Sequence, residues 1–158
     1  MFRRLTRSGA VQQRILASRR RVTEVTWEGV HSTLVLRRAA RGVVLLTIEG
    51  TDVGEHGLAP FDELAADVLW APFILFIDAR NSRGVTTDVS SAWCKWLARN
   101  RRALGAVHML SGSAYVRVTA NFVRTFAELD SLMHLYTEPA SFEATLEAAL
   151  REAKSSVD

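Results

Sequence analysis

A cluster of hydroxyl and carboxyl side chains opens a helix that the sequence predicts over residues 88–104. Ser90 and Ser91 follow Thr87 and Asp88 almost directly. The first backbone N–H groups of a helix have no partner within it, and the helix dipole adds partial positive charge, so this position favours an anion or a phosphoryl group. The same residue types are also ordinary helix N-caps, which is the alternative interpretation.

Basic side chains continue along the same predicted helix. If Ser91 points into solvent, Lys95 and Arg99 follow on its side at helical spacing, and Arg102 comes three residues later. Phosphorylation of a serine here would add about −1.5 to −2 charges beside this basic row at pH 7. We therefore predict Ser90 and Ser91 as phosphoswitch candidates, and the following residues as contacts for an anion or a partner: Thr87, Asp88, Lys95, Arg99 and Arg102.

Polar side chains also follow two of the predicted strands. Asp78, Arg80 and Asn81 come after a near-continuous apolar run at residues 72–77, while Ser111 and Ser113 come after a predicted strand at 106–110. Open α/β sheets bind ligands at the carboxyl ends of their strands, so these residues are candidates for the rim of a pocket. The alternative is that Asp78 caps the loop backbone and that the arginines are solvated.

Residues for covalent or metal chemistry are few and scattered. Cys94 lies in the middle of a predicted helix beside Lys95, and no sequence pattern pairs it with a histidine. Glu55 and His56, in a glycine-containing loop, form the one pair that suggests a site. No P-loop or dinucleotide fingerprint is present, and no histidines have the spacing of metal ligands on a helix. We expect no catalytic residue, no metal and no cofactor.

The composition is that of one soluble globular domain. The chain has 158 residues, of which 48% are hydrophobic and 23% charged. Its single cysteine excludes an internal disulfide framework, and no apolar run is long enough for a transmembrane segment. We therefore expect a cytoplasmic protein.

The positive charge is concentrated at the amino terminus. Residues 1–23 contain seven arginines and no acid, whereas the rest of the chain has 13 basic and 17 acidic side chains. This Arg-rich arm is open to three interpretations: a passive extension, a docking helix or dimer element, or a contact for a polyanion. We expect residues 1–23 to form an arm or helix, and residues 24–158 to form a single domain without specific nucleic-acid binding.

Hydrophobic periodicity gives the order of the elements. Two apolar runs joined by a short glycine-containing connection predict a hairpin, and strands that are separated by single helices require right-handed crossovers. The sequence thus predicts a mixed α/β sheet with an antiparallel hairpin near its start. The expected strands are 22–27, 31–37, 43–48, 72–77, 106–110 and 132–136, and the expected helices are 58–70, 88–104, 114–129 and 139–153.

Residues 31–150 resemble the STAS domain, which anti-sigma factor antagonists share with the cytosolic tails of sulphate transporters. The similar features are a hairpin that ends in Gly50, a central strand that closes on Asp78, and a helix that opens at Asp88 with two serines. The switch segment of the family is typically Asp-Ser-Ser-Gly or Asp-Ser-x-Gly, whereas this chain reads Asp-Val-Ser-Ser-Ala from Asp88 to Ala92. The resemblance implies a STAS-like fold and a serine phosphoswitch read by a protein partner, such as an anti-sigma-type kinase.

Two functions from different classes follow from these observations. The first is a non-enzymatic STAS-like regulatory module that binds a protein partner through the helix beginning at Asp88 and the loop before it. The second is a small-molecule carrier or sensor, in which an apolar or anionic ligand occupies the groove between the strand ends and the first two helices. A homodimer is compatible with either function.

Overall fold

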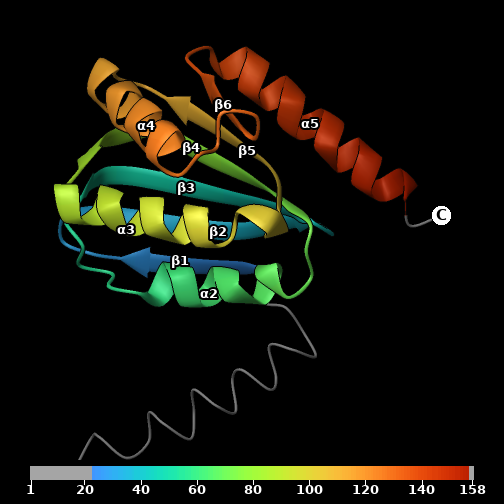
Figure 1. Cartoon of the computed structure of the whole chain (residues 1–158), viewed down its shortest axis with the longest axis horizontal. Helices are drawn as coiled ribbons and strands as arrows, with labels where there is room; N and C mark the ends of the chain where they lie inside the picture. Colours follow the sequence, from blue (N-terminus) through green and yellow to red (C-terminus); the bar gives the residue numbers. More distant parts are fainter. Residues whose placement is uncertain (1–22, 157–158) are drawn as a thin grey trace, which may run out of the picture.

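The computed structural model describes residues 23–156, and within them six strands form one sheet in the order β1-β2-β3-β4-β5-β6 (Figure 1). The predicted Arg-rich arm falls almost entirely on residues outside this range. The strands are β1 (Glu24–Glu28), β2 (Ser32–Ala40), β3 (Val43–Asp52), β4 (Phe73–Val85), β5 (Leu104–Ser111) and β6 (Met133–Tyr136). The helices are α2 (Ala59–Val68), α3 (Thr87–Arg99), the short 3-10 helix η1 (Arg101–Ala103), α4 (Ala114–Phe126) and α5 (Pro139–Ser155).

The pairing of the strands confirms the predicted mixed sheet. β1, β2 and β3 are antiparallel neighbours, while β3, β4, β5 and β6 pair in parallel. Each parallel pair is connected through a helix, as parallel strands require. Among the helices of the described residues, none is long and apolar enough to cross a lipid bilayer.

Helices cover both faces of the sheet, and β4 is buried between them. Leu75 and Ile77 belong to the core beneath α2, α3 and α4, whereas Phe76 contacts Phe142 of α5 on the opposite face. Successive side chains of a strand alternate between faces, so a central strand that is covered on both sides must be apolar at every position. This requirement explains the apolar run that made β4 recognisable in the sequence.

β4 is longer than the sequence predicts, which is a correction to the expected loop at residues 81–87. The strand continues to Val85, so Asp78, Arg80 and Asn81 lie inside it rather than after its end. Two irregularities in the pairing with β3, between Thr47 and Thr51, each insert one extra residue into β4. Polar residues and a glycine suggest a loop, but backbone pairing with β3 keeps residues 81–85 in the sheet, although the pairing of β4 with β5 ends at Ala79.

The helix ends show which side chains reach the core. Leu69, just past the end of α2, is 81% exposed, while Asp67 is buried. At the end of α4, Ala127 is buried and Phe126 is exposed. The predicted helix 88–104 ends early, because α3 stops at Arg99 and β5 already begins at Leu104.

Asp67 is buried because it neutralises a buried arginine. Arg38 of β2 donates to both carboxylate oxygens of Asp67, at 3.0 and 2.8 Å, and to Glu63 at 2.8 Å. The side chains of Arg38 and Asp67 are only 6% and 1% exposed. Removing one partner of such a pair leaves the other charge buried, so this contact fastens α2 to the sheet.

We expect Asp67→Ala to lower the free energy of unfolding by about 3–5 kcal/mol, measured by urea denaturation. Arg101→Ala is the control, because it breaks an ion pair with Glu128 whose side chains are 44% and 79% exposed. That variant should lose at most about 1 kcal/mol. Equal losses in the two variants would contradict the assigned role of the buried pair.

A second polar cluster lies beneath α5. His108 of β5 stacks between Phe76 and His134, and its Nδ1 is 2.9 Å from the Tyr136 hydroxyl. Burial lowers the pKa of His108 to about 4, and the positive charge of His134 acts in the same direction. The folded protein therefore holds this imidazole neutral at pH values where the unfolded chain protonates it.

The pKa of His108 predicts a loss of stability in acid. Because the folded pKa lies below the ordinary value of about 6.5, the contribution is complete above pH 6.5 and is lost as the pH falls toward 4. We expect the loss to be roughly 1–2 kcal/mol, since His108 is half-exposed and solvent screens part of the interaction. Between pH 7 and pH 4.5, the free energy of unfolding measured by urea denaturation should decrease less for His108→Gln than for the parent chain. Identical decreases would refute the assignment.

Candidate functional site

Three helices begin at one edge of the sheet. The parallel strands β3, β4 and β5 end at Asp52, Val85 and Ser111, and each leads into the next helix, α2, α3 or α4. The amino-terminal ends of these helices therefore gather at the carboxyl edge of the strands (Figure 1). This is the edge at which open α/β sheets place their functional groups.

The two predicted phosphoacceptors lie in different environments in the first turn of α3. Thr86 is the N-cap, and its hydroxyl accepts the Val89 N–H at 3.4 Å. Ser90 is half-buried and donates its hydroxyl to the carbonyl oxygen of Thr87 at 3.0 Å. Ser91 is exposed, and its hydroxyl makes no hydrogen bond within residues 23–156. Of the two serines, Ser91 is the one that a modifying enzyme can reach.

The predicted basic row is exposed next to Ser91. Lys95 and Arg99 follow Ser91 at four-residue steps on the outer side of α3, and Arg102 is exposed in η1. None of these three cations forms an ion pair within the described part of the chain. Thr87 and Asp88 are exposed at the start of the same helix. Four of the predicted anion- and partner-binding residues thus lie on α3 and the fifth, Arg102, lies in η1, all in positions open to solvent.

A pocket of about 210 Å³ lies between α2 and α3, in the groove that the sequence predicts for a ligand. Its walls come from the loop after β3, the first turns of α2 and the inner side of α3. Two carboxylates and one imidazole border an otherwise apolar space. The residues that line it include Asp52, His56, Phe61, Asp88, Val89 and Trp93.

The loop that borders this pocket is held by Glu55. Its carboxylate accepts the backbone N–H groups of His31 and Ser32 at 3.2 and 2.8 Å and the Ser32 hydroxyl at 2.8 Å. Burial alone would raise the pKa of Glu55, but the hydrogen bonds from Ser32 and His31 bring it below its ordinary value. The carboxylate therefore stays ionised and ties the loop to the β1–β2 connection.

His56 of the same loop also contacts Ser32, a partner that the sequence did not predict for it. His56 Nε2 is 2.9 Å from the Ser32 hydroxyl, and Ser32 is 4% exposed. A serine that is buried between a carboxylate and an imidazole fixes the loop and is closed to a substrate. Because Ser32 and His56 are 24 residues apart on different elements, no local pattern could have paired them.

A second, smaller cavity of about 70 Å³ lies between α3 and α4. Its floor consists of β-strand residues, including Ile77, Met109 and Met133, and its walls are formed by the facing sides of the two helices. Ser90 and Trp93 line it from α3, whereas Thr119 and Ala120 line it from α4. The sequence did not predict this cavity, because it depends on how far apart two helices pack.

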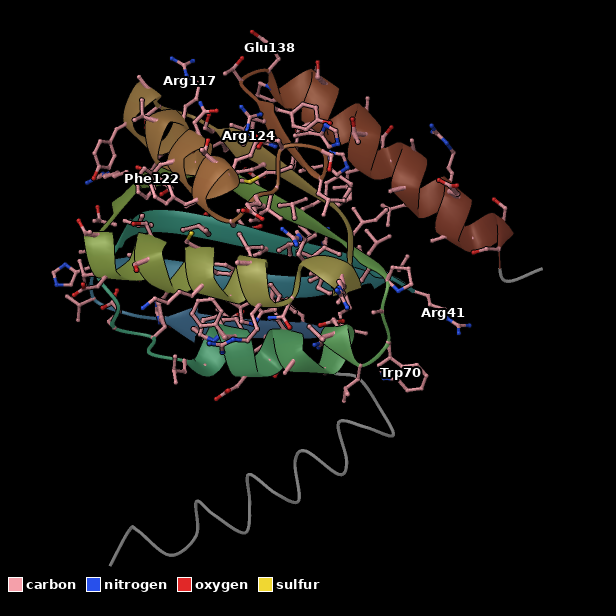
Figure 2. All side chains as sticks on the ribbon, in the orientation of Figure 1. Arg41, Trp70, Arg117, Phe122, Arg124 and Glu138 are labelled. Atoms are coloured by element: carbon pink, nitrogen blue, oxygen red, sulfur yellow. The ribbon has the colours of Figure 1, made fainter. Side chains whose placement is uncertain are left out.

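Large apolar side chains remain exposed around the same edge of the sheet. Val53 and Leu58, in the loop before α2, are 41% and 68% exposed, and Tyr115, in the first turn of α4, is 60% exposed. Exposed apolar side chains continue along α4 at Val118, Phe122 and Phe126. Figure 2 shows Phe122 and Arg117 on different sides of this helix. The rings of Phe122 and Phe126 are stacked with their centroids 4.1 Å apart, and contiguous exposed apolar side chains of this kind mark interaction sites.

The predicted pocket rim is taken up by internal contacts. Asp78 accepts from Arg80 Nε at 3.0 Å, and Arg80 Nη2 donates to Glu143 of α5 at 2.9 Å. Asn81 is an exposed residue inside β4, and Ser113 caps α4 by accepting the Val116 N–H at 3.2 Å. Ser111 is buried at the end of β5. The expectation that Asp78, Arg80 and Asn81 follow the end of the strand is therefore wrong, because β4 continues past them.

Other residues considered for chemistry are part of the packing. Cys94 is half-buried on α3, and Trp93 and Trp96 pack against Phe61 of α2, with ring centroids 4.7 and 6.1 Å from the phenyl ring. Among residues 23–156, no group of three or more His, Cys, Asp or Glu side chains is arranged to hold a metal ion.

Comparisons with known proteins give one structural likeness to report. No family model matches the chain, and no curated protein matches it. The chain is similar to the crystal structure of an anti-sigma factor antagonist from Mycobacterium paratuberculosis, with 16% sequence identity and a TM-score of 0.47. The match covers 79% of this chain and 93% of that one.

Proposed function

We propose that this chain is a non-enzymatic, STAS-like regulatory module that binds a protein partner through the amino-terminal end of α3 and the loops around it. The observation that carries the proposal is the group of exposed apolar side chains at this edge, Val53, Leu58 and Tyr115, next to the exposed face of α3. Protein interfaces combine an apolar centre with a polar and charged rim, and this edge offers both.

Phosphorylation of Ser91 would switch this surface. The hydroxyl is exposed in the first turn of a helix, where a phosphoryl group is favoured by the helix dipole. Lys95 lies one helical turn further on the same side, within reach of the added charge. A partner that binds the unmodified surface would then meet a dianion in place of a neutral hydroxyl. An anti-sigma-type kinase is the partner class that the sequence resemblance favours.

We expect phosphate on Ser91, and not on Ser90, when the purified chain is incubated with ATP and an extract of its native host and then mapped by mass spectrometry. Ser91→Asp should reduce the amount of the specific partner that is retained from the extract by about tenfold relative to Ser91→Ala, because a charge at an interface alters binding by 1–2 kcal/mol or more.

The matched control is Ser141→Asp, which introduces the same charge in the first turn of α5, on the opposite face of the sheet. This variant should retain the partner as the parent chain does. Equal retention by Ser91→Ala and Ser91→Asp would refute the switch, and loss of the partner in Ser141→Asp as well would show a general charge effect.

A second candidate function is supported by the pocket between α2 and α3. Its volume of about 210 Å³ is below the roughly 300–1,000 Å³ of sites for drug-sized ligands, so it suits a smaller molecule, and Phe61 and Trp93 supply apolar walls. The carboxylates of Asp52 and Asp88 border the same space, which favours an apolar or cationic ligand over an anionic one. In this function the chain is a carrier or sensor.

Native mass spectrometry of the freshly purified chain tests the carrier function. We expect a retained small mass in the parent chain and its loss in Ala92→Leu, which fills the pocket, since Ala92 is part of its lining. Ala98→Leu is the control, because Ala98 is exposed on the outer side of α3. A bare mass for the parent chain, or an equal retained mass in all three proteins, would exclude this pocket as the ligand site.

A further inference from the structure

The cavity between α3 and α4 is separate from the pocket that serves the second candidate function. Trp93 reaches both, but the cavity opens on the α4 side of α3, and its floor is formed by β4, β5 and β6. Apolar side chains make up most of its lining, including Leu97, Val123 and Met133. The space of about 70 Å³ is several times larger than one water molecule needs, and it is partly open to solvent, so that a small ligand can reach it.

The size and shape of the cavity suit a short chain of atoms. One water molecule needs roughly 10–15 Å³ of such space, so 70 Å³ admits about five or six water-sized groups. The wall on α3 extends from Ser90 to Leu97, and the wall on α4 from Val116 to Val123. At 1.5 Å per residue each wall is about 10 Å long. A space of this volume and length is narrow, and it favours an unbranched chain over a ring.

Three residues of this otherwise apolar lining carry hydroxyl groups. Ser82 is 6% exposed, and its hydroxyl oxygen accepts the Gly84 N–H at 3.3 Å, which leaves its proton to donate. Ser90 and Thr119 have donated their protons to the carbonyl oxygens of Thr87 and Tyr115, at 3.0 and 3.1 Å, and keep lone pairs to accept. Of the three, Ser82 is the buried one and the one whose proton is unused, so it offers a donor to a ligand atom that accepts a hydrogen bond.

We propose that this cavity binds an unbranched primary aliphatic alcohol of about five carbons. The alkyl chain lies along the sheet between Leu97 and Val123, and the hydroxyl group lies near Ser82. Met109 and Met133 form an adaptable floor, because the methionine side chain is flexible and fills irregular gaps. No cationic side chain lines the cavity, so a carboxylate head group would be buried without a counter-charge. The same argument excludes an ammonium head group, since no carboxylate lines it.

Methyl signals of the methionines report on this site directly. Two of the three methionines of the chain, Met109 and Met133, line the cavity, and the third is Met1. We expect titration of the full chain, labelled with ¹³C at the methionine methyl groups, with 1-pentanol to shift both signals saturably. The branched isomer 2,2-dimethyl-1-propanol and the charged pentanoate should each bind at least tenfold more weakly. Ser82→Ala should weaken the binding of 1-pentanol by threefold to tenfold, because one hydrogen bond to the ligand is lost.

Ala120→Leu tests the location of the site, since Ala120 is 3% exposed and lines the cavity. It should weaken binding at least tenfold, while Val118→Leu, on the exposed side of α4, leaves binding unchanged. Thr119→Leu, at a half-exposed lining position, provides the comparison if Ala120→Leu does not fold. Unshifted methionine signals, equal affinity of a folded cavity-filling variant, or pentanoate binding as tightly as 1-pentanol would overturn the proposal. None of these outcomes bears on partner binding at Ser91.

Discussion

The structure depends on the double burial of β4. This strand pairs in parallel with β3 and β5 and is covered by helices on both faces, so its side chains must satisfy two cores at once. The extra residue inserted between Asp78 and Asn81 shifts the alternation of side chains along the rest of the strand. Ser82 and Gly84 consequently line the cavity beneath α3 and α4. Gly84 has a φ of 148°, and a side chain there would overlap the ring of Tyr115, so glycine is required for α4 to pack against the strand end.

The start of α3 follows from the end of β4. Only Thr86 separates the strand from the helix, and its hydroxyl caps the helix while its N–H donates to the carbonyl oxygen of Asp52. This short connection fixes the rotation of the helix, so that Ser90 points to the cavity beneath α4 and Ser91 points to solvent. The two neighbouring serines thus lie in different environments, because Ser90 is packed against the cavity and Ser91 is accessible to modification.

Polar groups in this fold are buried where they connect separate elements. Arg38 and Asp67 connect β2 with α2, while Glu55 connects the loop after β3 with the β1–β2 connection. Each of these three groups has partners that satisfy its charge or hydrogen bonds, which is the condition for tolerating it away from water. The exposed cations of α3, among them Lys95 and Arg99, have no partner of this kind within residues 23–156, so they are available to a binding partner.

Local patterns in the sequence determined the order of the elements, the mixed α/β sheet and the helix that carries Ser90 and Ser91, because hydrophobic periodicity and capping residues act over a few positions. They did not determine the length of β4, since Asp78 and Asn81 suggest a loop and only pairing with β3 keeps the strand extended to Val85. The tertiary structure also decided which serine is exposed, how His56 meets Ser32, and where a cavity remains between two helices. These properties depend on the packing distance and rotation of elements far apart in the chain, which no local pattern encodes.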